Sequence, residues 1–91
     1  MLAAAALAAA ALQGILLPAA GQAQSSLLES VRKNPARAKA ICGQLRAMNQ
    51  QGVSYTSKQA TRSIAEQEGL SLVDAEVLTT YVVGLHCPDV R

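Results

Sequence analysis

The sequence has 91 residues, a net charge of +2 and 51% hydrophobic residues, and its aromatic residues are two tyrosines. This length allows at most one small domain. The modest charge, and the lack of aromatic side chains among the basic residues, argue against a protein that binds nucleic acid.

The first 23 residues have the pattern of a secretory signal peptide. Ala and Leu continue almost without interruption until Pro18, and the small-residue sequence GQA then ends at Ala23. This order predicts a signal peptide over 1–23 and a mature domain over 24–91. A retained anchor is the alternative, but the apolar stretch is shorter than the roughly 20 residues that a bilayer requires. We expect an exported protein in the periplasm, the thylakoid lumen or outside the cell, with no stable transmembrane span after cleavage.

Capping residues and helix breakers divide the mature region into helices. The sequence SLLE at 26–29 has the Ser-x-x-Glu form of a capping box and predicts a short first helix that ends at Lys33. Asn34 is expected to cap the second helix, with Pro35 at its first position. This helix is expected to stop at Gly52.

Two more helices follow the same pattern. The sequence TSKQ at 56–59 repeats the capping-box form, and the helix that it begins is expected to end at Gly69. Ser71 begins the fourth helix, which continues to His86 and is stopped by Pro88. No stretch shows the sustained alternation of a half-buried strand. The sequence therefore predicts an all-α fold, a small bundle of three to four short helices.

Helical periodicity predicts which side of each helix is buried. The third helix has little to bury, so we expect it to be the least stable. On the second helix, one arc carries Ile41, Cys42, Leu45 and Met48. On the third, the candidates are Ala60, Ile64 and Ala65. On the fourth, one half of the circumference carries Val73, Val77, Leu78, Tyr81, Val82 and Leu85.

The two cysteines predict one structural disulfide. In an exported protein an even number of cysteines indicates disulfides, and Cys42 and Cys87 allow only one intramolecular pair. This bond would close a loop of about 46 residues and contribute roughly 4 kcal/mol in the chain-entropy model. A redox site lacks its Cys-x-x-Cys motif, and a structural zinc site lacks a fourth ligand. Free or intermolecular thiols remain as alternatives.

The sequence offers no catalytic, cofactor or metal site. His86 adjoins Cys87, but neighbouring helix residues point about 100° apart, so we expect the histidine to interact with the helix C-terminus. With one histidine, no suggestively spaced carboxylates and no glycine-rich phosphate loop, the chain is expected not to be an enzyme.

Charge is distributed unevenly along the mature chain. Five basic residues and one acidic residue lie between 24 and 52, whereas the remainder has three basic and five acidic residues. Most of these are expected to lie on solvated helix faces. Contact with an anionic surface or an acidic partner is the alternative.

Two sets of residues are candidate contact surfaces. Leu72 and Val83 lie away from the predicted core side of the fourth helix. Small residues on the second helix form a stripe that another backbone could approach closely. The first helix or a partner could pack there, or the stripe could be a solvated surface that favours helix. We name this set the small-residue stripe: Ala36, Ala40, Gly43 and Ala47.

Three segments, AICGQL, GLSLVDAEVL and YVVGLHCP, together resemble small secreted helical proteins of unknown function from mycobacteria and their relatives. In those proteins a leader precedes a Cys-containing helix, and the last helix ends in Cys-Pro. The arrangement is also similar to small exported proteins of marine cyanobacteria. The resemblance covers about residues 36–88. It implies a helical domain in which Cys42 and Cys87 are joined, and it assigns no catalytic residue.

The leader, the cysteine pair and the lack of catalytic groups favour one function. The mature chain is interpreted as a non-enzymatic exported module that binds a protein or an envelope component. The alternative is a small carrier that encloses a lipid or another hydrophobic ligand between its helices. Its few large apolar residues, which must already close the core, argue against the carrier.

Overall fold

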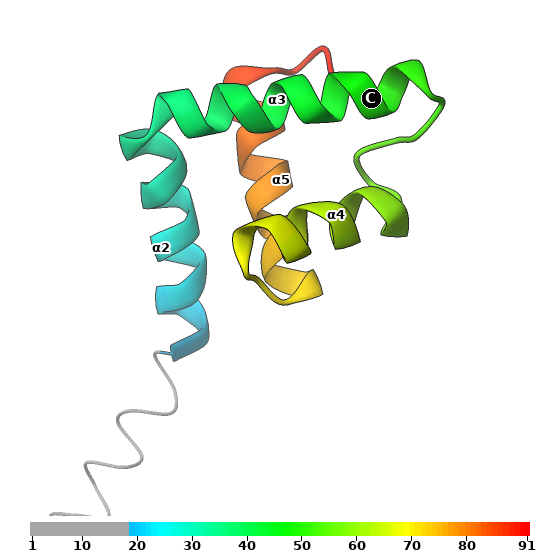
Figure 1. The fold of residues 1–91 in the computed structure, drawn as a ribbon. Coiled ribbons are helices and arrows are strands. Elements are labelled where there is room, and N and C mark those ends of the chain that lie inside the picture. Colours follow the sequence, from blue (N-terminus) through cyan, green and yellow to red (C-terminus); the bar gives the residue numbers. More distant parts are fainter. Residues whose placement is uncertain (1–18) are drawn as a thin grey trace, which may run out of the picture.

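The computed structural model describes residues 19–91, and over this range the chain forms helices and no strands (Figure 1). The predicted all-α fold is confirmed. Residues 1–18, most of the predicted signal peptide, lie outside the described residues. Figure 1 shows α2 and α5 running side by side, α3 crossing one end of both, and α4 crossing the other half of α5. The helices are α2 (Ala19–Lys33), α3 (Pro35–Gln50), α4 (Lys58–Glu68) and α5 (Leu72–His86).

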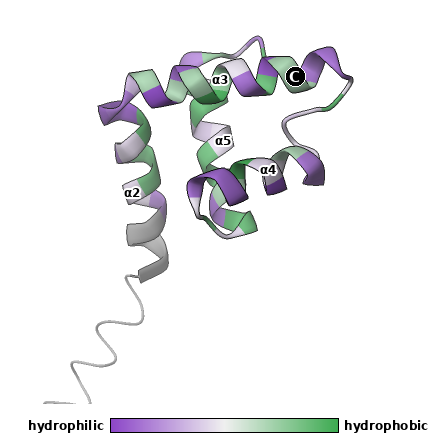
Figure 2. Ribbon diagram, in the orientation of Figure 1, coloured by the Kyte–Doolittle hydropathy of each residue, from purple (hydrophilic) through white to green (hydrophobic). Residues whose placement is uncertain are grey.

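Helix α5 is the centre of the bundle, because α2, α3 and α4 all pack against it. A helix that contacts neighbours on several sides buries residues around most of its circumference. Figure 2 accordingly shows hydrophobic residues recurring along α5, whereas hydrophilic residues predominate on the outward side of α4. The buried residues of α5 are Ala75, Leu78, Thr79, Val82 and Val83.

This central position corrects the predicted core side of the fourth helix. Leu78 and Val82 are buried as expected, but Val73 is 68% exposed and Leu85 is 51% exposed. Val83, predicted to face outward, is only 6% exposed and belongs to the core. The prediction failed because it looked for a single apolar arc on a helix that has three packing partners.

The predicted core sides of the second and third helices are confirmed. Ile41, Cys42 and Leu45 of α3 are buried, and Met48 is partly buried against them. On α4, the three expected residues are buried: Ala60, Ile64 and Ala65. Helix α2 contributes Val31 to the same core.

One disulfide joins the middle of α3 to the end of α5. The Cys42 and Cys87 sulfurs are 2.11 Å apart, their Cα atoms are 6.0 Å apart, and both residues are buried. Cys87 is also the C-cap of α5. The predicted bond is therefore present in the core, shielded from solvent.

The last residues are held against the end of α3. The Arg91 carbonyl accepts hydrogen bonds from the Tyr55 backbone N–H at 2.9 Å and from Asn49 Nδ2 at 2.8 Å. The Arg91 N–H donates to Asn49 Oδ1 at 2.7 Å, and Val90 is buried in the core. The segment after the disulfide thus extends the core beyond the last helix.

Most predicted helix boundaries are confirmed. Asn34 caps α3 by accepting a hydrogen bond from the Arg37 N–H at 3.2 Å, and Ser71 caps α5 by accepting one from the Asp74 N–H at 3.1 Å. Gly69 ends α4 in the left-handed conformation, with φ at 66°. This conformation favours glycine because it has no Cβ atom.

Two predicted helix starts were wrong. Helix α2 begins at Ala19, so Ser26 lies inside a helix and does not cap it. The segment from Ala19 to Lys33 contains no proline, so the residues before Ser26 can be helical. Helix α4 is capped by Ser57, whose hydroxyl accepts from the Ala60 N–H at 3.1 Å, whereas the Thr56 hydroxyl lies 2.9 Å from that of Ser54.

Candidate functional site

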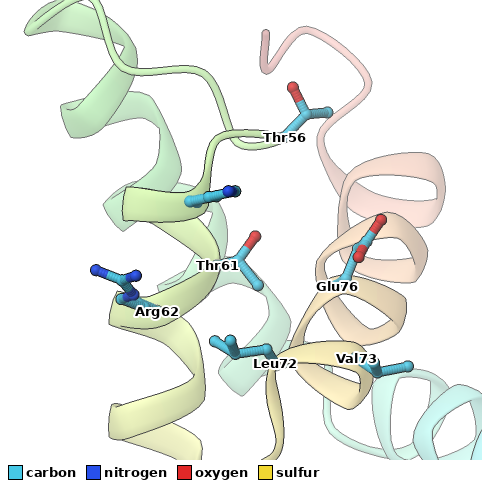
Figure 3. Close-up of a pocket in the computed structure, with 7 residues that line it drawn as sticks. Thr56, Thr61, Arg62, Leu72, Val73 and Glu76 are labelled. Carbon is cyan, nitrogen blue, oxygen red and sulfur yellow. The ribbon is translucent and has the colours of Figure 1, made fainter.

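A groove lies between α4 and the first turns of α5, with a volume of about 330 Å³ (Figure 3). We name it the α4–α5 groove. Figure 3 places Thr61 on the α4 wall, Glu76 on the α5 wall and Leu72 at the lower end between them. Its lining residues are Thr56, Lys58, Thr61, Arg62, Leu72, Val73 and Glu76.

Local sequence signals position both walls of the groove. The Ser57 cap makes Lys58 the first residue of α4, and Arg62 follows one turn later on the same side. Gly69 ends this helix, and the Ser71 cap begins α5 after a short connection. The first turn of α5, with Leu72 and Val73, is therefore held beside α4.

The groove combines exposed apolar side chains with a polar rim. Leu72 is 53% exposed and Val73 is 68% exposed. A second hollow of about 370 Å³ shares Val73 and Glu76 with the groove and reaches Gln24 of α2. The apolar start of α5 thus stands between two concave surfaces, one toward α4 and one toward α2.

The hydroxyl groups at the groove already have partners within the chain. Thr61 donates to the Ser57 carbonyl at 3.0 Å, and Thr56 is hydrogen-bonded to Ser54. The charged groups are Lys58, Arg62 and the Glu76 carboxylate, and Figure 3 shows Arg62 pointing away from α5. An apolar centre with a mixed polar rim is typical of non-covalent contact surfaces. Within residues 19–91 no three His, Cys, Asp or Glu residues lie close enough together to hold a metal ion.

Ion pairs connect the basic first half of the mature chain to the acidic second half. Arg46 donates two hydrogen bonds to the Asp89 carboxylate, at 2.9 and 3.0 Å. These bonds raise the pKa of Arg46 and lower the pKa of Asp89. Arg37 Nε lies 2.6 Å from Glu68 Oε1. Lys33 also pairs with Glu29 of its own helix, at 3.1 Å. Three of the five basic residues therefore have acidic partners within the chain, which reduces the positive charge left for an anionic surface.

The structure divides the predicted contact residues into exposed and buried ones. The small-residue stripe on α3 is exposed along its length, so α2 does not cover it: Ala36, Ala40, Gly43 and Ala47. Leu72 is exposed at the α4–α5 groove, as predicted for a surface residue. Val83 is buried and cannot be part of a contact surface, because it packs within the core.

Val73, the more exposed of the two apolar groove residues, was not predicted to lie at the surface. Val73 was assigned to the core because it shares an arc with Val77 and Leu78. It is exposed because it lies in the first turn of α5, at the end of the bundle. Its position next to the Ser71 cap was the available signal, since first-turn side chains can extend beyond the neighbouring helices.

A model of a protein family described as a domain of unknown function (DUF8664) matches residues 28–87. The match covers more than half of the chain, so the chain belongs to this family. No curated protein and no solved structure matches the sequence. The matched range contains both cysteines of the disulfide and all residues that line the α4–α5 groove.

Proposed function

We propose that this family member is an exported helical module that binds a protein or an envelope component at the α4–α5 groove. One observation carries the proposal: Leu72 and Val73 are consecutive, apolar and more than half exposed, and both line the groove. Exposed apolar residues at a concave surface with a polar rim mark interaction sites. The partner is expected to present an apolar side chain to Leu72 and Val73 and polar groups to Lys58 and Glu76.

The buried disulfide supports the export part of the proposal. Disulfides persist mainly in oxidising compartments outside the cytoplasm. Leu27 and Val31, which pack against the core from α2, both follow the predicted cleavage after Ala23. No helix within residues 19–91 has the length and apolar character to cross a bilayer. We also propose that the chain is related to the small exported proteins of mycobacteria and marine cyanobacteria that its sequence resembles.

The packing of the bundle gives no support to the carrier alternative. A carrier needs an enclosed interior space for its ligand, and the two larger hollows beside α5 are open to the surface. The hollow bordered by Val31, Ile41, Leu78 and Val82, between α2, α3 and α5, has a volume of about 10 Å³. That is about the space needed for one water molecule.

The groove also supports a non-enzymatic role. Thr61 and Thr56 use their hydroxyl groups in bonds that shape the start of α4. A nucleophilic hydroxyl must give its proton to a base, but the Thr61 hydroxyl donates its proton to the Ser57 carbonyl. The one histidine of the chain, His86, lies at the opposite end of α5 from Leu72. We therefore assign the groove to binding rather than to a reaction.

Site-specific photo-crosslinking in the producing cell tests the proposal. A photoreactive amino acid at position 73 is expected to form a discrete crosslinked product that includes an envelope protein or lipid. Position 85 is the matched control, because Leu85 lies on the same helix, is similarly exposed and does not line the groove. Equal product from both positions, or none from position 73, would contradict a binding role for the groove. Loss of the product in a Leu72→Glu variant, with Leu85→Glu unaffected, would show that the apolar contact is specific.

A further inference from the structure

The amino terminus left by leader removal is a site of chemical modification. We propose that Gln24, once it becomes the first residue, cyclises to pyroglutamate and gives the exported protein an uncharged, blocked terminus. This inference rests on the export part of the proposed function, namely cleavage between Ala23 and Gln24.

The structure leaves Gln24 accessible for this reaction. Its side chain is exposed, and so are those of Ser25 and Ser26. Among residues 24–91, the first that packs against the core is Leu27, three positions later. Two exposed residues, Ser25 and Ser26, therefore separate the new terminus from the core, and the Gln24 side chain can rotate to meet its own α-amino group.

The reaction needs no oxidant, reductant or cofactor. Hydrolysis of the Ala23–Gln24 peptide bond leaves a free α-amine on Gln24. The unprotonated amine attacks Cδ of the Gln24 side-chain amide, a bond forms between the α-nitrogen and Cδ, and the bond from Cδ to Nε2 breaks. Ammonia leaves, and the terminus becomes a five-membered lactam that is a neutral amide.

The change removes a charge that α2 does not favour. A cation at a helix N-terminus opposes the macrodipole, which is positive at that end. The shortened helix would carry the protonated amine of Gln24 at this end if the terminus stayed open. Before cleavage the SLLE sequence at 26–29 lies in the middle of α2 and cannot act as a cap. After cleavage it lies close to the new terminus, where its Ser-x-x-Glu form matches the start of a helix.

The alternative to cyclisation is an ion pair between the free α-amine of Gln24 and the Glu76 carboxylate. Gln24 and Glu76 line the same hollow between α2 and α5. An α-amine that pairs with this carboxylate stays protonated. A protonated amine has no lone pair with which to attack the side-chain amide. The two states predict different masses for the mature protein, because only cyclisation releases ammonia.

Intact-mass measurement of the exported protein tests the inference. The full-length gene product is expressed in an export-competent host, and the processed protein is isolated and incubated at neutral pH until its mass is constant. The expected mass is that of residues 24–91 with the disulfide formed, less one molecule of ammonia. N-terminal sequencing should be blocked, and treatment with pyroglutamate aminopeptidase should expose Ser25 as the first residue.

A Gln24→Ala variant is the matched control, because alanine has no side-chain amide from which ammonia could leave. It should be processed at the same bond, lose no ammonia and give a readable sequence. A wild-type protein that begins with open Gln24, even after addition of glutaminyl cyclase, would overturn the cyclisation while leaving export intact. A product that keeps residues before Gln24 would overturn the cleavage and the inference with it.

Discussion

Two valines on α5 provide a direct test of how this helix is oriented in the bundle. Val73 and Val83 belong to the same helix, yet Val73 is 68% exposed and Val83 is 6% exposed. Helical periodicity read from the sequence assigns them the opposite way. Replacing each by alanine makes the same chemical change in the two environments.

The expected losses differ by about 2 kcal/mol. Val83→Ala removes two buried carbon atoms, worth about 0.8 kcal/mol each, and leaves a small cavity that adds to the cost. The better helix propensity of alanine offsets roughly 0.5 kcal/mol of this, so a net loss of about 2 kcal/mol remains. Val73→Ala removes mostly solvated atoms, and its effect should stay within about 0.5 kcal/mol of zero.

Urea denaturation of the oxidised proteins, followed by far-UV circular dichroism, measures both changes in free energy of unfolding. Circular dichroism is suitable because the chain has no tryptophan to report unfolding by fluorescence. Equal urea dependence for the three proteins would show that the same unfolding reaction is compared. If Val73→Ala costs as much as Val83→Ala, or more, the described orientation of α5 is wrong.

Two further predictions concern the glycines and one ion pair. Gly43→Ala should raise the free energy of unfolding by about 0.5 to 1 kcal/mol, because Gly43 lies inside α3 and nothing lies within 4 Å of the added Cβ atom. Gly69→Ala should instead lower it by about 1 kcal/mol, since position 69 has a φ of +66°; the reverse order would refute both assignments. The Arg46 hydrogen bonds lower the pKa of Asp89, so their stabilisation is present at neutral pH and is lost as the pH falls through that lowered pKa. Asp89→Asn should therefore lower the melting temperature slightly at pH 7 and leave it unchanged in strong acid. A gap that persists in acid would contradict this origin.

The helix boundaries were largely predictable because they depend on local chemistry. Asn34, Gly69 and Ser71 each act through their own side chain or backbone conformation, and the structure places them at the boundaries that the sequence predicts. The same local reasoning failed at Ser26, where helix-compatible residues precede a potential cap. A capping motif predicts a helix start only if the chain before it is not already helical.

The packing of α5 and the groove could not be read from the sequence in the same way. A helix with three neighbours has apolar residues on most sides, so periodicity does not identify a single buried arc. For this reason Val73 was predicted to be buried and Val83 to be exposed, the reverse of what the structure shows. The α4–α5 groove arises from the relative placement of two helices, and no spacing within one helix encodes it. Leu72 was the one groove residue that the sequence identified as part of a contact surface.

The Cys42–Cys87 bond, between residues separated by 45 positions, holds α3 to the end of α5 in a bundle with a small core. The free energy of unfolding of the exported protein, measured with the disulfide intact and after reduction, tests this claim directly. Reduction should lower it by roughly 4 kcal/mol, the loop entropy that the bond removes from the unfolded chain. Two freely reactive thiols in the purified protein, or equal stability of the oxidised and reduced forms, would contradict the claim.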